Sequence, residues 1–503
     1  MWDELIKTAL LGTERTDLPD SLEDLLKAFK LPQAPSSEEA LLQLLSVYGA
    51  AKKTAVINTK VKFEKFETLL DDNACGTAAT KSLKLILKGM HAPALNEFLE
   101  LLEQYQQVLP PSMLPELFEE ARSNKKLWND IKHLIGQRGE WLLAQNADWM
   151  HLGNQVVEVD WKFASKEVRL LLLKYWRKNK PQKATKSIES TWSEEDWKSK
   201  VEFLKTLEIG LSKKDEPFLN KGLTESRKEI RKIAGTLLLK ISDSEYSEQL
   251  FGLLKKHITL KKVNIHVELP EEIDDRYGAI IHFDKKKSLS KGIKSVALGQ
   301  LFSKIPLEKW ETHFQFEPKE LVPMFLRSNE RQVMGEHLIN ACYEQENEKW
   351  IAPLLHYWLQ EKSNLNFMSW QIKDLVPLLS DKTFNQLAMA NLPKEPQLLG
   401  ELVPLFIFLK NSTQHWDDDL SEKIINPLKE HISKIQSFNW STWHYKELLN
   451  TAAYRVNPSL LQRGLADEWN LGNSGQEMWQ PEIEQFLGGL RFRKKMYLGF
   501  AKV

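Results

Sequence analysis

Cysteine is nearly absent from this 503-residue chain. Cys75 and Cys342 are the only two, and they lie far apart in the sequence. Two isolated cysteines cannot form a disulfide framework, and no C-x-x-C pair is present that would bind zinc. The cysteine content therefore fits a reducing compartment, and we expect the protein to be cytoplasmic.

Long apolar runs are also missing. No stretch approaches the roughly 18 uninterrupted apolar residues of a membrane-spanning helix. The opening sequence Met-Trp-Asp-Glu-Leu-Ile has an acidic start and does not resemble a signal peptide. We therefore expect neither a membrane segment nor a secretory leader.

The chain has no excess charge of either sign. Its 69 lysines and arginines balance its 69 aspartates and glutamates. A protein that binds nucleic acid generally needs a surplus of basic residues to attract phosphate. Nucleic acid is therefore not an expected partner.

The short motifs of common enzyme classes are absent as well. There is no G-x-x-x-x-G-K-[ST] phosphate loop, no G-x-S-x-G nucleophile elbow and no H-E-x-x-H zinc motif. His266 and His282 are close in sequence, but such isolated histidines are typical of a protein surface. The acidic run at residues 271–275 lacks the spacing of an EF-hand, and a solvated loop explains it. We expect no catalytic residues, no metal and no cofactor.

What the chain does contain is a repeated helical pattern. Three segments place large apolar residues on one face and Lys, Arg and Glu on the other: residues 166–176, 197–207 and 228–238. Their starts are about 31 residues apart, close to the length of known helix-pair repeats. One pair cannot bury its own apolar face, so neighbours must stack. The pattern predicts an all-α fold, an α-solenoid of HEAT-like helical hairpins, with Leu172, Leu204 and Leu237 buried.

Helical periodicity continues on both sides of this block. A first helix should end at Gly12, and Ser36 or Ser37 should cap the next one, whereas Lys52–Phe66 reads as a loop. Prolines from Pro306 to Pro481 recur at intervals that we interpret mostly as helix starts. We predict four regions: N-terminal helices over residues 1–125, a repeat block over 126–259, an insertion over 260–290 and C-terminal repeats over 291–503.

One interval interrupts the helical pattern. Val263, Ile265, Val267 and Leu269 alternate with polar residues, which is the period of a β-strand. We predict a small irregular or β insertion around residues 260–287, containing a short hairpin. Insertions on repeat proteins often carry binding function.

Four segments resemble a widespread bacterial family of unknown function: Leu10–Arg15, Gly136–Trp149, Gly210–Glu216 and Ile305–Trp310. The most specific is the second, which reads G-x-R-G-x-W-L-x-x-x-N-x-x-W. The resemblance implies a HEAT-like helical protein. Members of the family are often encoded beside a MoxR-type AAA ATPase, a von Willebrand A protein and a SWIM zinc-finger protein. No activity is established for the family, so the resemblance implies protein partners and no catalytic residues.

Tryptophan is abundant, with seventeen in the chain. We interpret most of them as fillers of the gaps between stacked helices. Trp and Arg also dominate the hot spots of protein interfaces. Arg138, Trp141 and Trp149 of the second motif are therefore candidate partner-binding residues. Arg138 lies between Gly136 and Gly139 and could equally bond carbonyl groups at a helix end.

Two hypotheses for function follow. The first is a non-enzymatic scaffold or adaptor that binds a protein partner, for example an AAA ATPase or a von Willebrand A protein. The alternative is a HEAT-like enzyme that processes nucleic acid, similar to a DNA glycosylase, with a site that no motif reveals. A continuous basic groove with a buried carboxylate would favour the second. Balanced charge and absent motifs favour the first.

Overall fold

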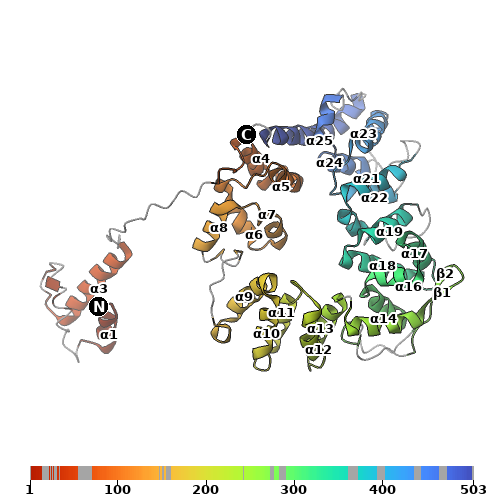
Figure 1. The fold of residues 1–503 in the computed structure, drawn as a ribbon. Coiled ribbons are helices and arrows are strands. Elements are labelled where there is room, and N and C mark those ends of the chain that lie inside the picture. Colours follow the sequence, from red (N-terminus) through yellow and green to blue (C-terminus); the bar gives the residue numbers. More distant parts are fainter. Residues whose placement is uncertain are drawn as a thin grey trace. The chain divides into compact units, whose positions relative to one another are not determined.

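The computed structural model describes most of the chain, and nearly all the regular structure that it describes is helical (Figure 1). This confirms the prediction of a mostly α-helical protein. No described helix is long and apolar enough to cross a lipid bilayer. The structure leaves undescribed residues 1, 14–21, 23, 25, 28–30, 33, 55–70, 147, 150–151, 154–159, 242, 272–276, 282–290, 361–371, 394–402, 436–442, 464–468, 470–472 and 501–503.

The chain divides into two compact units, residues 1–69 and residues 70–503. The first unit holds α1 (Trp2–Leu11) and α3 (Ser37–Thr54) around a small leucine core. Gly12 ends α1 with φ near +81°, a conformation that glycine adopts without strain, as predicted. The Ser36 hydroxyl accepts a hydrogen bond from the Glu39 N–H and caps α3. Since α3 continues to Thr54, the predicted loop begins later than expected, and its remainder lies outside the described residues.

The second unit begins with five short helices. They are α4 (Thr77–Leu87), α5 (Leu95–Gln104), α6 (Leu114–Ala121), α7 (Lys125–Ile131) and α8 (Gly136–Gln145). Pro111 begins the turn before α6, a position where the missing N–H of proline costs no helical hydrogen bond. Asn124 caps α7, because its side chain accepts a hydrogen bond from the Leu127 N–H. The apolar faces of these helices form one core.

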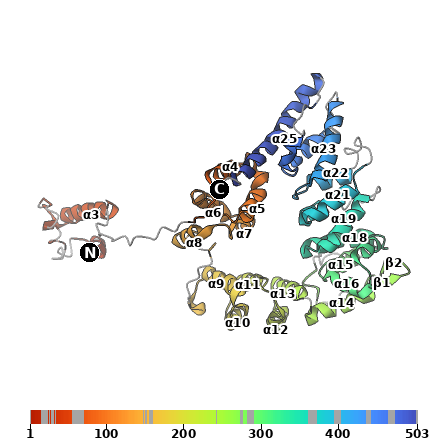
Figure 2. The same cartoon turned by 45° about the horizontal axis from the view of Figure 1, so that its top comes forward.

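The predicted repeat block is the next part of the unit. It contains α9 (Lys166–Asn179), α10 (Pro181–Thr191), α11 (Trp197–Thr206), α12 (Glu216–Leu223), α13 (Lys228–Lys240) and α14 (Glu245–His257). The three segments with the shared pattern are α9, α11 and α13, which pack side by side (Figure 2). Leu172 and Leu204 are fully buried and Leu237 is 4% exposed, so the predicted register is confirmed.

A buried ion pair fixes the turn between α11 and α12. Arg177 and Asp215 are fully buried and pair through two hydrogen bonds of 2.9 Å. Arg177 also donates to the carbonyl groups of Leu207, Ile209 and Gly210. Gly210 has φ near +61°, and a side chain there would clash with the Arg177 carbonyl. The family-like segment Gly210–Glu216 therefore supplies both the glycine and the aspartate that this turn requires.

A two-stranded antiparallel hairpin follows α14 directly. Its strands are β1 (Ile258–Lys261) and β2 (Asn264–Val267). The hairpin confirms a small β element, but it begins before residue 260, and Val263 lies in the turn with 71% of its surface exposed. Asn329 holds the outer edge of β2 by bonding both the N–H and the carbonyl of Val267 at 2.8 Å. His282 and most of the acidic run lie outside the described residues.

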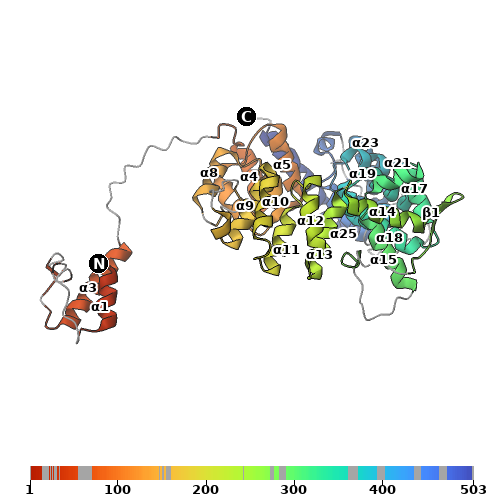
Figure 3. The same cartoon turned by 60° about the horizontal axis from the view of Figure 1, so that its bottom comes forward.

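The remaining helices follow the hairpin along the chain, and α17 lies beside it (Figure 3). They are α15 (Lys291–Ser303), α16 (Leu307–Phe314), α17 (Pro318–Leu326), α18 (Arg331–Gln345), α19 (Glu348–Gln360), α21 (Asp381–Ala390), α22 (Val403–Lys410), α23 (Asp418–Ser433), α24 (Trp443–Ala452) and α25 (Asn473–Phe500). Their buried residues and those of the repeat block form one continuous core. The family-like segment Ile305–Trp310 places a fully buried tryptophan in it, and most tryptophans described in the unit are likewise packed, as predicted.

Several prolines do not lie where the sequence analysis places them. Pro306 precedes α16 and Pro318 begins α17, as expected. Pro323, Pro353 and Pro427, however, lie inside α17, α19 and α23. An interior proline removes one helical hydrogen bond and costs about 3 kcal/mol. These helices persist because one face of each is buried in the core, a tertiary effect that local sequence does not show.

The last helix joins the two cores of the unit. The first half of α25 packs in the large core, and Phe492, Met496 and Phe500 pack in the core of α4–α8. Between them, Arg493 is buried and binds Glu97 of α5 through Nε at 2.6 Å and Nη2 at 2.7 Å. Tyr497 donates to the same carboxylate at 2.8 Å. Helix α25 thus contacts helices that precede it by almost the whole unit.

We predict that Leu172→Ala, Leu204→Ala and Leu237→Ala each destabilise the protein by about 2–5 kcal/mol, because each leaves a cavity in a packed core. The shift of the urea unfolding midpoint measures the effect. Leu498→Ala is the matched control, since Leu498 is 51% exposed on α25. Midpoints that move no more than in the control would show that the three leucines are not core residues.

We predict that Arg493→Met alone destabilises the protein by about 3–5 kcal/mol, because it leaves the Glu97 carboxylate buried without its cation. Adding Glu97→Leu should restore part of the loss, since the second change removes the unpaired charge. Thermal unfolding of the single and double variants measures both. A double variant less stable than the single one would contradict this account.

Candidate functional site

The three candidate residues of the G-x-R-G-x-W motif have different surroundings. Arg138 and Trp141 lie three residues apart on α8 and therefore on neighbouring positions of one helix face. Arg138 is half-buried and Trp141 is 37% exposed. Trp149 packs edge-to-face on Phe118 and donates its indole N–H to Glu119 at 3.2 Å. Trp149 thus contributes to the core of α4–α8, whereas Arg138 and Trp141 have partly exposed surfaces.

The glycines of this motif serve the start of α8. Gly136 has φ near +66°, and an added side chain would clash with the Asp71 carboxylate. That carboxylate accepts hydrogen bonds from the backbone N–H groups of Gln137 and Arg138 at 2.7 and 3.1 Å. It therefore caps the start of the helix through the backbone of Arg138, without using the Arg138 side chain.

A repeated basic residue organises the starts of α9, α11 and α13. The fourth residue of each helix is Arg169, Lys200 or Arg231. Arg169 pairs with Glu195, and Lys200 pairs with Glu225 at 2.9 Å, so each base binds a carboxylate just before the next repeat helix. These side chains fix the helix starts relative to one another.

Backbone contacts complete this arrangement. Arg169 also donates to the carbonyl groups of Lys162 and Ala164 at 3.0 Å, and Arg231 donates to those of Glu225 and Ser226. The segments that precede α9 and α13 are therefore held against the helices that they lead into.

We give the name N-terminal edge to three residues just before or at the starts of these helices: Phe163, Trp197 and Arg227. Phe163 precedes α9 and is 88% exposed, and Trp197 begins α11 and is 42% exposed. The Arg227 guanidinium, at the cap of α13, lies 5.7 Å from the centre of the Trp197 ring. Exposed aromatic and arginine side chains on a rigid frame are typical of interface anchors.

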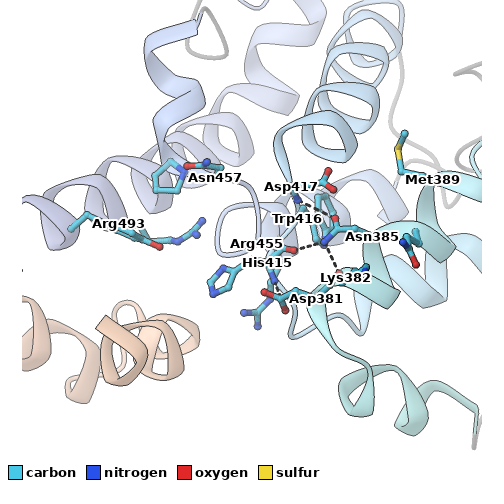
Figure 4. A pocket seen from close by; sticks show the side chains of 13 residues that line it. Asp381, Lys382, Asn385, Met389, His415, Trp416, Asp417, Arg455, Asn457 and Arg493 are labelled. Atoms are coloured by element: carbon cyan, nitrogen blue, oxygen red, sulfur yellow. Dashed lines mark hydrogen bonds between the residues drawn. The ribbon is translucent and has the colours of Figure 1, made fainter. Parts of the chain in front are cut away.

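A second feature is a cavity of about 670 Å³ in the part of the second unit where α25 meets α5 (Figure 4). We call it the junction cavity. Its walls come from one side of α21, from the loop His415–Asp417, from the segment Arg455–Pro458 and from α25. Sequence analysis does not single out any of these residues, because they approach one another only through the packing of the last helices.

Asn385 holds one wall of the junction cavity. Its amide nitrogen donates to the carbonyl groups of Asp381 and His415 at 2.8 Å, and its oxygen accepts from the Asp417 N–H at 3.0 Å. The Trp416 N–H donates to the Arg455 carbonyl at 2.9 Å, which joins this loop to the next wall. The cavity therefore has a fixed frame.

Ionised groups surround the junction cavity. His415 Nε2 lies 3.0 Å from a Glu100 oxygen on α5, and this hydrogen bond raises the pKa of His415. Burial lowers the pKa of Arg455, and the nearby charge of Arg493 acts in the same direction. Lys382 and Asp381 complete the lining from α21. The cavity is polar and has charges of both signs.

Within the described residues, no group of three or more His, Cys, Asp or Glu side chains is arranged to hold a metal ion. Both cysteines are free thiols in buried positions. Burial raises the pKa of Cys75 to about 11 and raises that of Cys342 as well. Both thiols are therefore protonated near neutral pH, whereas a cysteine nucleophile must be a thiolate.

We predict that the His415–Glu100 contact stabilises the protein at low pH and loses its effect at high pH. Because the folded-state pKa is raised, the contribution is fully present below about pH 6.5, the unfolded value, and disappears as pH rises through the folded value. The charges facing His415 are those of Glu97, Glu100 and Arg493. Melting temperatures of His415→Gln and Glu100→Gln across this range should show a weaker decline than wild type. Equal slopes in all three proteins would contradict the prediction.

Comparison with known proteins identifies the family alone. No curated protein and no solved structure matches the chain. One family model, described as a family of unknown function (DUF5691), matches residues 4–498, which is nearly the whole chain and includes the N-terminal edge and the junction cavity. The chain therefore belongs to this family of unknown function.

Proposed function

We propose that the protein is a non-enzymatic interaction scaffold, an α-solenoid of stacked HEAT-like hairpins that binds a protein partner at its N-terminal edge. Repeat proteins of this kind work through extended surfaces, and each repeat adds a similar position to the surface. Phe163, Trp197 and Arg227 occupy such positions on three successive repeat helices.

The exposure of the edge residues is the observation that carries this proposal. Phe163 is 88% exposed although other aromatic residues of the block, such as Trp161 and Phe203, are buried. Scattered exposed apolar residues need no explanation, but exposed aromatic side chains at the starts of successive packed helices are candidates for an interaction site. Trp197 with Arg227 above its ring is the combination that dominates measured hot spots.

The proposed partner belongs to the protein classes that the family resemblance implies. These are a MoxR-type AAA ATPase and a von Willebrand A protein of the same bacterial host, and the complex would form in the cytoplasm. A nucleic-acid-processing role receives less support. Asp381 and Asp417 lie beside Lys382 and Arg455 in the junction cavity, so its lining is not the continuous basic groove that a nucleic acid requires.

We predict that Trp197→Ala weakens binding to the MoxR-type ATPase or the von Willebrand A protein by about 2 kcal/mol or more, because it removes a central aromatic anchor. Calorimetric titration of the purified proteins measures the change. Trp443→Ala is the matched control, because Trp443 is a tryptophan of similar exposure, 49%, on α24.

Arg138→Ala in the same titration tests the face of α8. The Asp71 carboxylate caps α8 through backbone groups, so this change should leave the melting temperature close to that of wild type. Weaker binding by Arg138→Ala alone would move the proposed interface from the N-terminal edge to α8. Binding of neither protein by the wild-type chain would reject the proposed partners, and equal losses for Trp197→Ala and Trp443→Ala would reject the N-terminal edge.

A further inference from the structure

We propose that the junction cavity binds a small molecule through an oxyanion, a carboxylate or a phosphate group, which the terminal nitrogens of Arg455 hold. This inference goes beyond the scaffold function and does not depend on it. Four observations carry it: the anchoring of Arg455, its free hydrogen-bond donors, the state of the charges around it, and the size and lining of the cavity.

Arg455 is anchored at its inner end. Its Nε donates to the Ser412 carbonyl at 3.0 Å, and its own carbonyl accepts from the Trp416 N–H at 2.9 Å. Ser412 is buried, and its hydroxyl accepts from the Trp416 indole at 3.1 Å. The guanidinium plane is therefore held in place before any ligand arrives, which lowers the entropic cost of binding.

The terminal nitrogens of Arg455 have hydrogen-bond donors that no described residue uses. In the described part of the chain, Nη1 and Nη2 make no hydrogen bond, although the side chain lines the cavity. Two parallel N–H groups of a guanidinium match two oxygens of a carboxylate or phosphate. Arg493, by comparison, spends all three of its nitrogens on Glu97 and on the carbonyl groups of Ala453 and Val456.

The charges near Arg455 are already engaged elsewhere. Glu97 binds Arg493, and Glu100 binds His415. Asp417 caps α23 by accepting from the Leu420 N–H at 2.8 Å, and Asp381 accepts from the His415 N–H at 3.3 Å. Burial and the charge of Arg493 lower the pKa of Arg455, while the charges of Glu97, Glu100 and Asp381 act in the opposite direction. An anion at Nη1 and Nη2 would supply the missing partner.

The size and lining of the cavity define the class of ligand. A volume of about 670 Å³ lies within the range of roughly 300–1,000 Å³ typical of small-molecule sites. Lys382 and Gln386 offer further polar contacts from α21, and Met389 offers an apolar one. This lining fits a polar metabolite with a carboxylate or phosphate group.

Calorimetric titration of the full-length protein with inorganic phosphate and, separately, with succinate tests the proposal. Ionic strength is held constant with chloride, so that non-specific screening does not differ between titrations. We expect saturable binding of at least one probe, and the stronger probe identifies the oxyanion. Arg455→Lys keeps the charge but loses the paired donors, and it should weaken binding about tenfold or more. Arg331→Lys is the matched control, because Arg331 is exposed at the start of α18 and lies outside the cavity lining, and it should bind as wild type does.

A second measurement covers the case in which Arg455→Lys fails to fold. Hydrogen exchange of the wild-type protein with the stronger probe should slow at residues 381–389, 412–417 and 455–458, the walls of the cavity. Lys382→Gln, a change on the accessible start of α21, should weaken binding by a smaller factor. Absence of saturable binding by both probes would overturn the proposal. Protection confined to other segments, or equal binding by Arg455→Lys and Arg331→Lys, would overturn it as well.

Discussion

The second unit depends on a buried ion pair between residues that are 396 positions apart. Arg493 and Glu97 are almost completely removed from water, and the bidentate geometry together with Tyr497 and two backbone carbonyl groups satisfies every polar atom of the pair. A buried charge without such partners would cost several kcal/mol. The pair therefore strongly favours one way of packing α25 on α5 over others. The position of the junction cavity follows from that choice, since α25 provides one of its walls.

A second buried pair performs a related task inside the repeat block. Arg177 donates hydrogen bonds to the carbonyl groups at the end of α11 and to the Asp215 carboxylate before α12. One side chain thus holds the whole turn. The pairs at the helix starts, Arg169–Glu195 and Lys200–Glu225, are less deeply buried, with side chains that are 11–19% exposed. The two sets differ in role. The buried arginines define how helices connect, and Arg169 and Lys200 hold the starts of neighbouring helices together.

The sequence predicted those features that depend on local order. The periodic spacing of apolar residues predicted the helices, and the spacing of three similar segments predicted that α9, α11 and α13 pack on one another. Gly12 predicted the end of α1. The sequence analysis placed Pro323 and Pro353 at helix starts, but they lie inside α17 and α19. Burial in the core stabilises these two helices, and local sequence does not show that burial. The hairpin began earlier than predicted, since Ile258 and Thr259 continue from a helix without a break in the pattern.

The candidate sites also contain some residues that a local motif reveals and others that only tertiary packing brings together. Arg138, Trp141 and Trp149 stand out in one short motif, yet the sequence could not say that Trp149 would pack on Phe118. Arg455, His415 and Asn385 lie in separate segments with no shared motif, and only tertiary packing brings them to one cavity. A weak signal for the N-terminal edge was present, because Phe163, Trp197 and Arg227 each lie close to the start of a repeated segment.

Helix α25 contributes residues to both cores, and this has a consequence for synthesis on the ribosome. The core of α4–α8 needs Phe492, Met496 and Phe500, and the Glu97 carboxylate needs Arg493. At about 5–20 residues per second, the 396 residues that separate Glu97 from Arg493 take roughly 20–80 s to translate. During that interval the early helices expose an apolar face and an unpaired acid to the cell. Nascent chains of this protein should therefore be substrates for chaperones at their first folded segment, long before the last helix emerges.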